Sequence, residues 1–216
     1  MGQLGKHFEE RIKELIRPLL ERGRGGDLEH TLRAVEYGRY LLQHERGEKE
    51  IVIPTLYLHD IGWSKVPLRD FVEAPAGQKK RTKSVSLHMK HGALLAKDIL
   101  EKLGWTNESS RRILSIIAIH DDREKVFQTN DSSAIMVFEA DRLDRYGPES
   151  FHRFSAMFGP AFLSDEHGKE ALTYLRRGLK RWFKTPTAKT LAEKLARDQG
   201  LFDENKTSFN GERQVP

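Results

Sequence analysis

Four histidines and two aspartates occur in a fixed order along the chain, each at or near the end of a segment with helical periodicity. They are His30, His59, Asp60, His88, His120 and Asp141. Because about 110 residues separate the first from the last, the six side chains can meet only if several helices bundle around a common point. Imidazole and carboxylate groups bind hard and borderline metal ions, and six of them are enough for two ions. The order of these residues therefore predicts a helical bundle with a metal site.

The same order resembles the HD superfamily of metal-dependent phosphohydrolases, which is named after its His-Asp doublet. It is most similar to the branch with two-metal sites, whose pattern is H…HD…H…H…D, and the resemblance covers roughly residues 27–145. The dipeptide alone is a weak signal, since the chain contains it twice, at His59-Asp60 and His120-Asp121. The full ordered set is much more specific. The resemblance implies an all-α HD-domain helical bundle around a dinuclear metal site.

Composition narrows the possible chemistry. The 216 residues include no cysteine, which excludes disulfides, thiolate-bound zinc and iron–sulfur clusters. No run of about 18 apolar residues is present to span a membrane, and no signal-peptide core precedes residue 24. We therefore expect a cytoplasmic protein without a membrane partner. The net charge of +5 suits a phosphate-bearing ligand, although an ordinary solvated surface explains it better. Nucleic acid is not an expected partner, and the oligomeric state stays open.

The resemblance implies a single HD domain over residues 1–216, and the breaks in the helical pattern divide it into helices. We expect an N-terminal helix at 8–21, kinked or broken at Pro18, a core of about 27–147, a C-terminal helical extension at 149–200 and a loose tail at 203–216. Asp27 is predicted to cap a helix that runs to about Gln43. The next helix should carry His59 and Asp60 in its last turn and stop at Gly62 as its C′ residue.

Residues 63–85 hold no period and are predicted to form a long loop that selects the substrate. Ser86 should cap a helix over 87–103. Further helices are expected from Thr106 to His120, over 132–146, and in the extension near 149–157, 168–183 and 188–198. No segment shows the alternating pattern of a strand, so the pattern alone also predicts an all-α fold.

What the resemblance implies residue by residue is a pair of ions bridged by Asp60. One ion would be bound by His30, His59 and Asp141, and the other by His88 and His120. Other readings exist for single residues. Asp141 could pair with Arg142 or Arg145, and His30 could be a core histidine. Asp121 or Asp122 could orient a ligand histidine.

The third element of the pattern offers His88 and His91. The family pattern has a histidine four residues before a glycine, which fits His88 and Gly92. His91 lies one turn further along nearly the same helix face. We therefore predict His88 as the metal ligand and His91 as a contact to substrate phosphate.

Two ions close together lower the pKa of a bridging water and neutralise charge on a phosphoryl group. The expected cofactor is two divalent transition-metal ions, with iron or manganese favoured and cobalt, nickel or zinc possible. Many family members have a lysine directly after the glycine, in the form HDxGK. Here Trp63 follows Gly62, so Lys65 is the nearest lysine. Catalytic roles are assigned to Asp60, Lys65 and His91. Cationic phosphate contacts, placed over the metals as a lid, are predicted for Lys79, Lys80, Arg81 and Lys83.

The predicted function is hydrolysis of a nucleotide or small phosphate ester by a metal-bridging hydroxide. Two alternatives remain open, and the six ligands do not separate the first of them from a hydrolase. One is a mixed-valent di-iron oxygenase resembling inositol oxygenase, and the other is a non-catalytic regulator that binds metal or nucleotide. The branch that hydrolyses cyclic dinucleotides has HHE at the fourth element and a GYP signature. This chain has His120-Asp121-Asp122 and no GYP, which argues against that activity.

Overall fold

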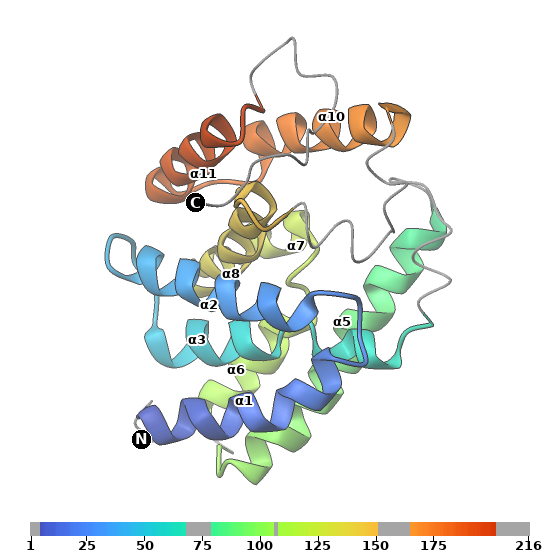
Figure 1. The fold of residues 1–216 in the computed structure, drawn as a ribbon. Helices are drawn as coiled ribbons and strands as arrows, with labels where there is room; N and C mark the ends of the chain where they lie inside the picture. The colour runs from blue at the N-terminus through green and yellow to red at the C-terminus, as the bar shows by residue number, and fades with distance from the viewer. Residues whose placement is uncertain (1–4, 68–78, 106–107, 151–164, 202–216) are drawn as a thin grey trace, which may run out of the picture.

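The computed structural model describes residues 5–67, 79–105, 108–150 and 165–201 (Figure 1). Within these ranges the chain forms helices and turns and no strand, which confirms the predicted all-α fold. The elements are α1 (Lys6–Leu20), α2 (Asp27–Leu42), α3 (Lys49–Leu58), η1 (Ile61–Lys65), α5 (Lys79–Lys102), α6 (Glu108–Ile117), α7 (Arg123–Gln128), α8 (Ser132–Leu143), η2 (Asp144–Tyr146), α10 (Asp165–Arg181) and α11 (Pro186–Asp198).

Helix α1 shows how spacing decides burial. Phe8, Ile12, Ile16 and Leu20 recur every fourth residue and are all buried, so they form one apolar stripe. The predicted break at Pro18 is wrong, since the helix is continuous to Leu20. Pro18 lies so close to the helix end that its missing N–H affects only the last turn.

Helices from the middle of the chain pack against one another and form the centre of the bundle. α2 packs against α3 and α8, α3 against α6, and α5 against η1 and α6. Helices α10 and α11 lie at the end of the bundle opposite α1 (Figure 1). A single hydrophobic cluster nevertheless includes buried residues from α1 through α11. No helix in the described ranges is both long and apolar enough to cross a bilayer.

Two predicted helix ends differ from the structure. Gly26, not Asp27, is the N-cap of α2, and its φ of 79° is in the left-handed region that glycine tolerates best. The carboxylate of Asp27 instead accepts the backbone N–H of Arg24 at 2.8 Å. Helix α3 ends at Leu58, so Gly62 is not its C′ residue but part of η1. There the chain passes so close to α5 that a Cβ on Gly62 would lie 1.9 Å from the carbonyl oxygen of His88.

Helix α5 begins at Lys79, eight residues before the predicted start at Leu87, and Ser86 lies inside it rather than capping it. Residues 79–85 of the predicted loop therefore belong to α5 and residues 63–65 to η1, and residues 68–78 lie outside the described residues. Helix α7 was not predicted; Asp122 caps it by accepting the N–H of Lys125. In the extension, α10 and α11 agree with the helices expected near 168–183 and 188–198. The helix expected near 149–157, beyond residue 150, and the tail at 203–216 lie outside the described residues.

Candidate metal centre

Five elements bring the six predicted ligands together at the centre of the bundle. His30 comes from the first turn of α2, and His59 and Asp60 directly follow α3. The others come from α5, from the turn after α6, and from α8; they are His88, His120 and Asp141. All six side chains are buried. They form two groups of three potential metal ligands: His30, His59 and Asp141, and Asp60, His88 and His120.

The first group is compact. The Nε2 atom of His30 lies 3.2 Å from Nε2 of His59 and 3.1 Å from Oδ1 of Asp141. The distance from His59 Nε2 to the same carboxylate oxygen is 4.0 Å. Two imidazole nitrogens and one carboxylate oxygen thus face a common point.

The second group has the same composition. The Nε2 atoms of His88 and His120 are 3.3 Å apart and lie 3.6 and 3.7 Å from Oδ1 of Asp60. The other oxygen of Asp60, Oδ2, is 3.5 Å from Nε2 of both His30 and His59. Asp60 therefore offers one oxygen to each group.

In three of the histidines, a hydrogen bond from Nδ1 determines that Nε2 is the ring nitrogen that faces the centre. His59 Nδ1 donates to the carbonyl of Leu56 at 2.6 Å, and His120 Nδ1 donates to the carbonyl of Ile117 at 2.8 Å. In both cases the acceptor lies three residues earlier, where the chain leaves a helix. His30 Nδ1 donates to the carboxylate of Asp144 at 2.7 Å. A neutral ring that donates from Nδ1 presents a lone pair at Nε2, which is how most ligand histidines are held.

The donors fit divalent transition-metal ions. Inside each group two Nε2 atoms lie 3.2 or 3.3 Å apart in a buried space, and a cation between them would stabilise this arrangement. Burial lowers the pKa of His59 and lowers that of His88 to about 3, so both rings are neutral at neutral pH, as metal binding requires. Burial opposes protonation of His120 as well, but its contact with Asp60 raises the pKa of that ring.

Arginines neutralise the buried carboxylates. Arg24 Nη2 lies 2.5 Å from Asp60, and Arg142 Nη1 lies 2.5 Å from Asp141. Burial alone would raise the pKa of each carboxyl group, but the two guanidinium charges hold both values well below the ordinary range. The same separation of 2.5 Å joins Arg33 to Asp144.

The sequence analysis missed the contacts of Arg24 and Trp63 with Asp60, and those of Asp144 with His30 and Arg33. Arg24 lies in the glycine-rich segment before α2, and its guanidinium also stands over the ring of Trp63 at 4.1 Å. Trp63 donates from Nε1 to Asp60 Oδ1 at 3.1 Å. Asp121, which was considered as an orienting residue, has Oδ2 3.8 Å from His88 Nε2 and pairs with Arg142. The remaining candidate for that role, Asp122, caps α7 instead.

Several predicted substrate contacts lie outside both groups. His91 is half-buried one turn after His88 on α5, and Lys65 is exposed at the end of η1. Lys83 is exposed within the first turns of α5. The remaining predicted contacts belong to the helix rather than to a loop, and their side chains are not among those described: Lys79, Lys80 and Arg81.

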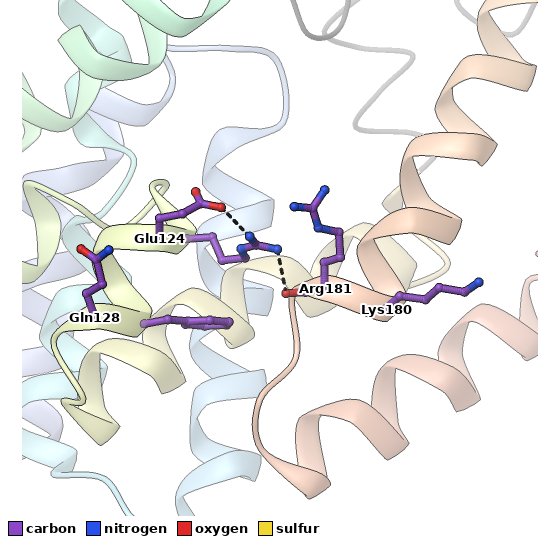
Figure 2. Close-up of a pocket in the computed structure, with 6 residues that line it drawn as sticks. Glu124, Gln128, Lys180 and Arg181 are labelled. Carbon is purple, nitrogen blue, oxygen red and sulfur yellow. Dashed lines mark hydrogen bonds and ion pairs between the residues drawn. The ribbon is translucent and has the colours of Figure 1, made fainter.

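A groove of about 470 Å³ lies between α7 and the end of α10 (Figure 2). Glu124 and Gln128 stand on one side of it and Lys180 and Arg181 on the other. None of the six predicted ligands lines it. The groove is therefore a separate surface feature and not the entrance to either group.

Comparison with known proteins adds the family. The model of the HD domain matches residues 27–146, which is more than half of the chain. No curated protein and no solved structure matches it. HD domains bind divalent metals, and most members of the family are metal-dependent hydrolases of phosphate substrates. On the strength of this match and of an all-α bundle with buried His and Asp groups, the chain belongs to the HD domain family.

Proposed function

We propose that the protein is a two-metal phosphohydrolase that acts on a nucleotide or a small phosphate ester. One ion would be bound by His30, His59 and Asp141, and the other by His88 and His120. The observation that carries the proposal is the position of Asp60. Its two oxygens face different groups, at 3.5 Å from His30 and His59 and at 3.6 and 3.7 Å from His88 and His120. A carboxylate so placed can bridge two ions.

Hydrogen bonds and ion pairs within the protein hold these potential metal ligands in position. The hydrogen bonds from Nδ1 hold three of the rings, and Arg24 and Trp63 hold Asp60 from outside the groups. When bound, two divalent ions would supply hydroxide near neutral pH and neutralise the charge that develops on a phosphoryl group. Mixed nitrogen and oxygen donors suit iron or manganese, and cobalt, nickel or zinc are also compatible.

Substrate contacts are proposed on α5 and η1. His91 and Lys83 lie on either side of His88 along α5, and Lys65 ends the segment that follows the His-Asp doublet. Lysine acts on phosphate as a mobile point charge, so an exposed side chain at the edge of the site suits this role.

The proposal is tested by paired aerobic and anaerobic assays with manganese and with iron. We expect phosphate release that does not depend on oxygen and that disappears in Asp60→Ala and His88→Ala, together with bound metal. His91→Ala should keep its metal and raise KM, and the exposed His44→Ala serves as the matched control. Strict dependence on oxygen, with iron alone active, would favour a di-iron oxygenase. Bound metal without turnover of any phosphate ester would favour a regulator.

A further inference from the structure

Arg145 differs from the other arginines around the metal centre. Arg24, Arg33 and Arg142 each have a carboxylate oxygen at 2.5 Å. Arg145 has its nearest carboxylate oxygen, on Asp121, at 4.0 Å, which is beyond hydrogen-bond distance.

The guanidinium of Arg145 has donors to spare. Of its five N–H groups, one contacts a hydroxyl, with Nη1 3.3 Å from the Tyr174 oxygen. Its Nε is buried and has no hydrogen-bond partner in the part of the chain that the structure describes. The side chain is 18% exposed and the contact with Tyr174 lies at the surface, so a ligand can reach part of the guanidinium while its Nε is not satisfied by protein. A buried donor left in this state is costly, and a ligand is one explanation for it.

The position of Arg145 links it to the metal centre. Arg145 directly follows Asp144, whose carboxylate accepts the hydrogen bond from His30 Nδ1. Its guanidinium faces Asp121. Asp121 in turn lies 3.8 Å from His88 Nε2 and pairs with Arg142, which also contacts Asp141. A group bound by Arg145 would therefore lie beside the second group of ligands.

The extension completes this corner of the site. Tyr174 is 43% exposed, and its ring meets that of Trp182 edge to face with centroids 4.9 Å apart. The Trp182 ring also lies 5.5 Å from the Arg145 guanidinium carbon. Both aromatic residues come after residue 146, where the family match ends. The guanidinium of Arg145 therefore contacts both an aromatic ring and a phenol hydroxyl from the extension.

We propose that Arg145 binds the phosphate group of the substrate through its unused N–H groups, with the Tyr174 hydroxyl as a second donor. This proposal rests on the proposed function and assigns its substrate to the phosphate monoesters, whose dianionic oxygens match the planar fork of a guanidinium. Arg142 pairs with Asp121, so Asp121 orients Arg145 by electrostatic attraction and accepts no hydrogen bond from it.

The test compares wild type with Arg145→Gln, Arg145→Lys and Tyr174→Phe. Arg177→Gln, on the exposed face of α10, is the control for the change in net charge. Three quantities are measured for each variant: bound metal, calorimetric affinity for inorganic phosphate with and without manganese, and kcat and KM for a phosphate monoester. Metal content separates a role in binding phosphate from a role in supporting the metal ligands.

We expect Arg145→Gln to keep its metal. Its affinity for phosphate should fall, and its KM should rise, by about 10- to 100-fold. Arg145→Lys should recover part of the loss, Tyr174→Phe should lose less, and Arg177→Gln should match wild type. Unchanged phosphate affinity in Arg145→Gln, no phosphate binding by wild type, or loss of metal in Arg145→Gln would each overturn the proposal. Phosphate binding that depends on Arg145 without turnover of any ester would contradict the proposed function and leave this assignment standing.

Discussion

The indole ring of Trp63 stacks on the imidazole of His88, with ring centroids 4.2 Å apart and planes 10° apart. The same indole donates a hydrogen bond to Asp60. Trp63 therefore fixes two potential ligands of the same group, one by packing and one by a polar contact.

Removing the Trp63 ring should damage both the fold and the second ligand group. We expect Trp63→Ala to lower the free energy of unfolding by about 3–5 kcal/mol, as for other large buried side chains, and to weaken metal binding. Trp63→Phe keeps an aromatic ring and loses the hydrogen bond, so its cost should be about 1–2 kcal/mol. Urea unfolding and elemental analysis measure the two effects. Equal metal content in Trp63→Ala and wild type would contradict the assigned role.

Gly62 is predicted to tolerate no side chain. A Cβ there would lie 1.9 Å from the carbonyl oxygen of His88 and 2.5 Å from the backbone nitrogen of Gly92. Since both contacts are backbone, Gly62→Ala should cost about 4 kcal/mol or more and separate the His-Asp doublet from His88. Gly92→Ala, whose nearest contact is Ile117 Cγ2 at 3.3 Å, is the milder control. A thermal shift of equal size in both variants would refute the steric explanation.

Removal of metal should not unfold the protein. Asp60, Asp141 and Asp144 each have an arginine partner at 2.5 Å, so their charges stay paired when no ion is bound. We expect chelation to leave the helical circular dichroism intact and to lower Tm only by the binding free energy that is lost. Collapse of the helical signal on chelation would show instead that folding depends on metal.

Arg24 should matter most in the metal-free protein. Arg24→Gln withdraws the guanidinium from buried Asp60, and breaking a buried pair costs about 3–5 kcal/mol. Bound metal would offset part of this cost, so the variant should be destabilised more without metal than with it. Urea unfolding in both states measures the difference, and the exposed Arg22→Gln is the control. An equal loss in both states would mean that Arg24 acts only on the fold.

The N-cap of α8 predicts a dependence of stability on pH. Asp131 accepts the N–H groups of Ser133 and Ala134, and the hydrogen bond from Arg112 lowers its pKa below the ordinary value. Its contribution is therefore complete above the unfolded pKa of about 3.9 and disappears as the pH falls through the lower folded value. Asp131→Ala should cost about 1–2 kcal/mol at neutral pH and approach wild type as the pH falls below the folded pKa of Asp131. The exposed Asp98→Ala should show no such convergence; a constant difference at Asp131 would contradict the linkage.

The helices and the ligand candidates could be predicted because both have local signals. Apolar spacing marked α1, α10 and α11, and the ordered histidines and aspartates identified the six residues that the fold brings together. The start of α5 could not be predicted in this way, because Pro67, Pro75 and Gly77 break the pattern just before it. As a result, the sequence analysis placed in a loop lysines that lie on α5 in the structure.

Arg142 was considered as a partner of Asp141 from the sequence, and the structure shows that pair, but the long-range partners of Arg24 and Arg145 could not be predicted. Arg24 stands among glycines, which indicate a flexible joint, and its partner Asp60 is 36 residues away. Arg145 stands beside Asp144, yet it faces Asp121 and Tyr174 instead. Burial of such charges is decided by tertiary partners, and a single sequence does not contain their positions.

Glu139 joins the C-terminal extension to the region that matches the family. It is buried two residues before Asp141, and it accepts hydrogen bonds from the backbone of Lys184 and from both the backbone and the hydroxyl of Thr185. These donors lie well past residue 146, where recognisable family similarity stops. A chain cut after residue 146 would lose these donors, so the extension supplies hydrogen bonds that a buried carboxylate of the matched region needs.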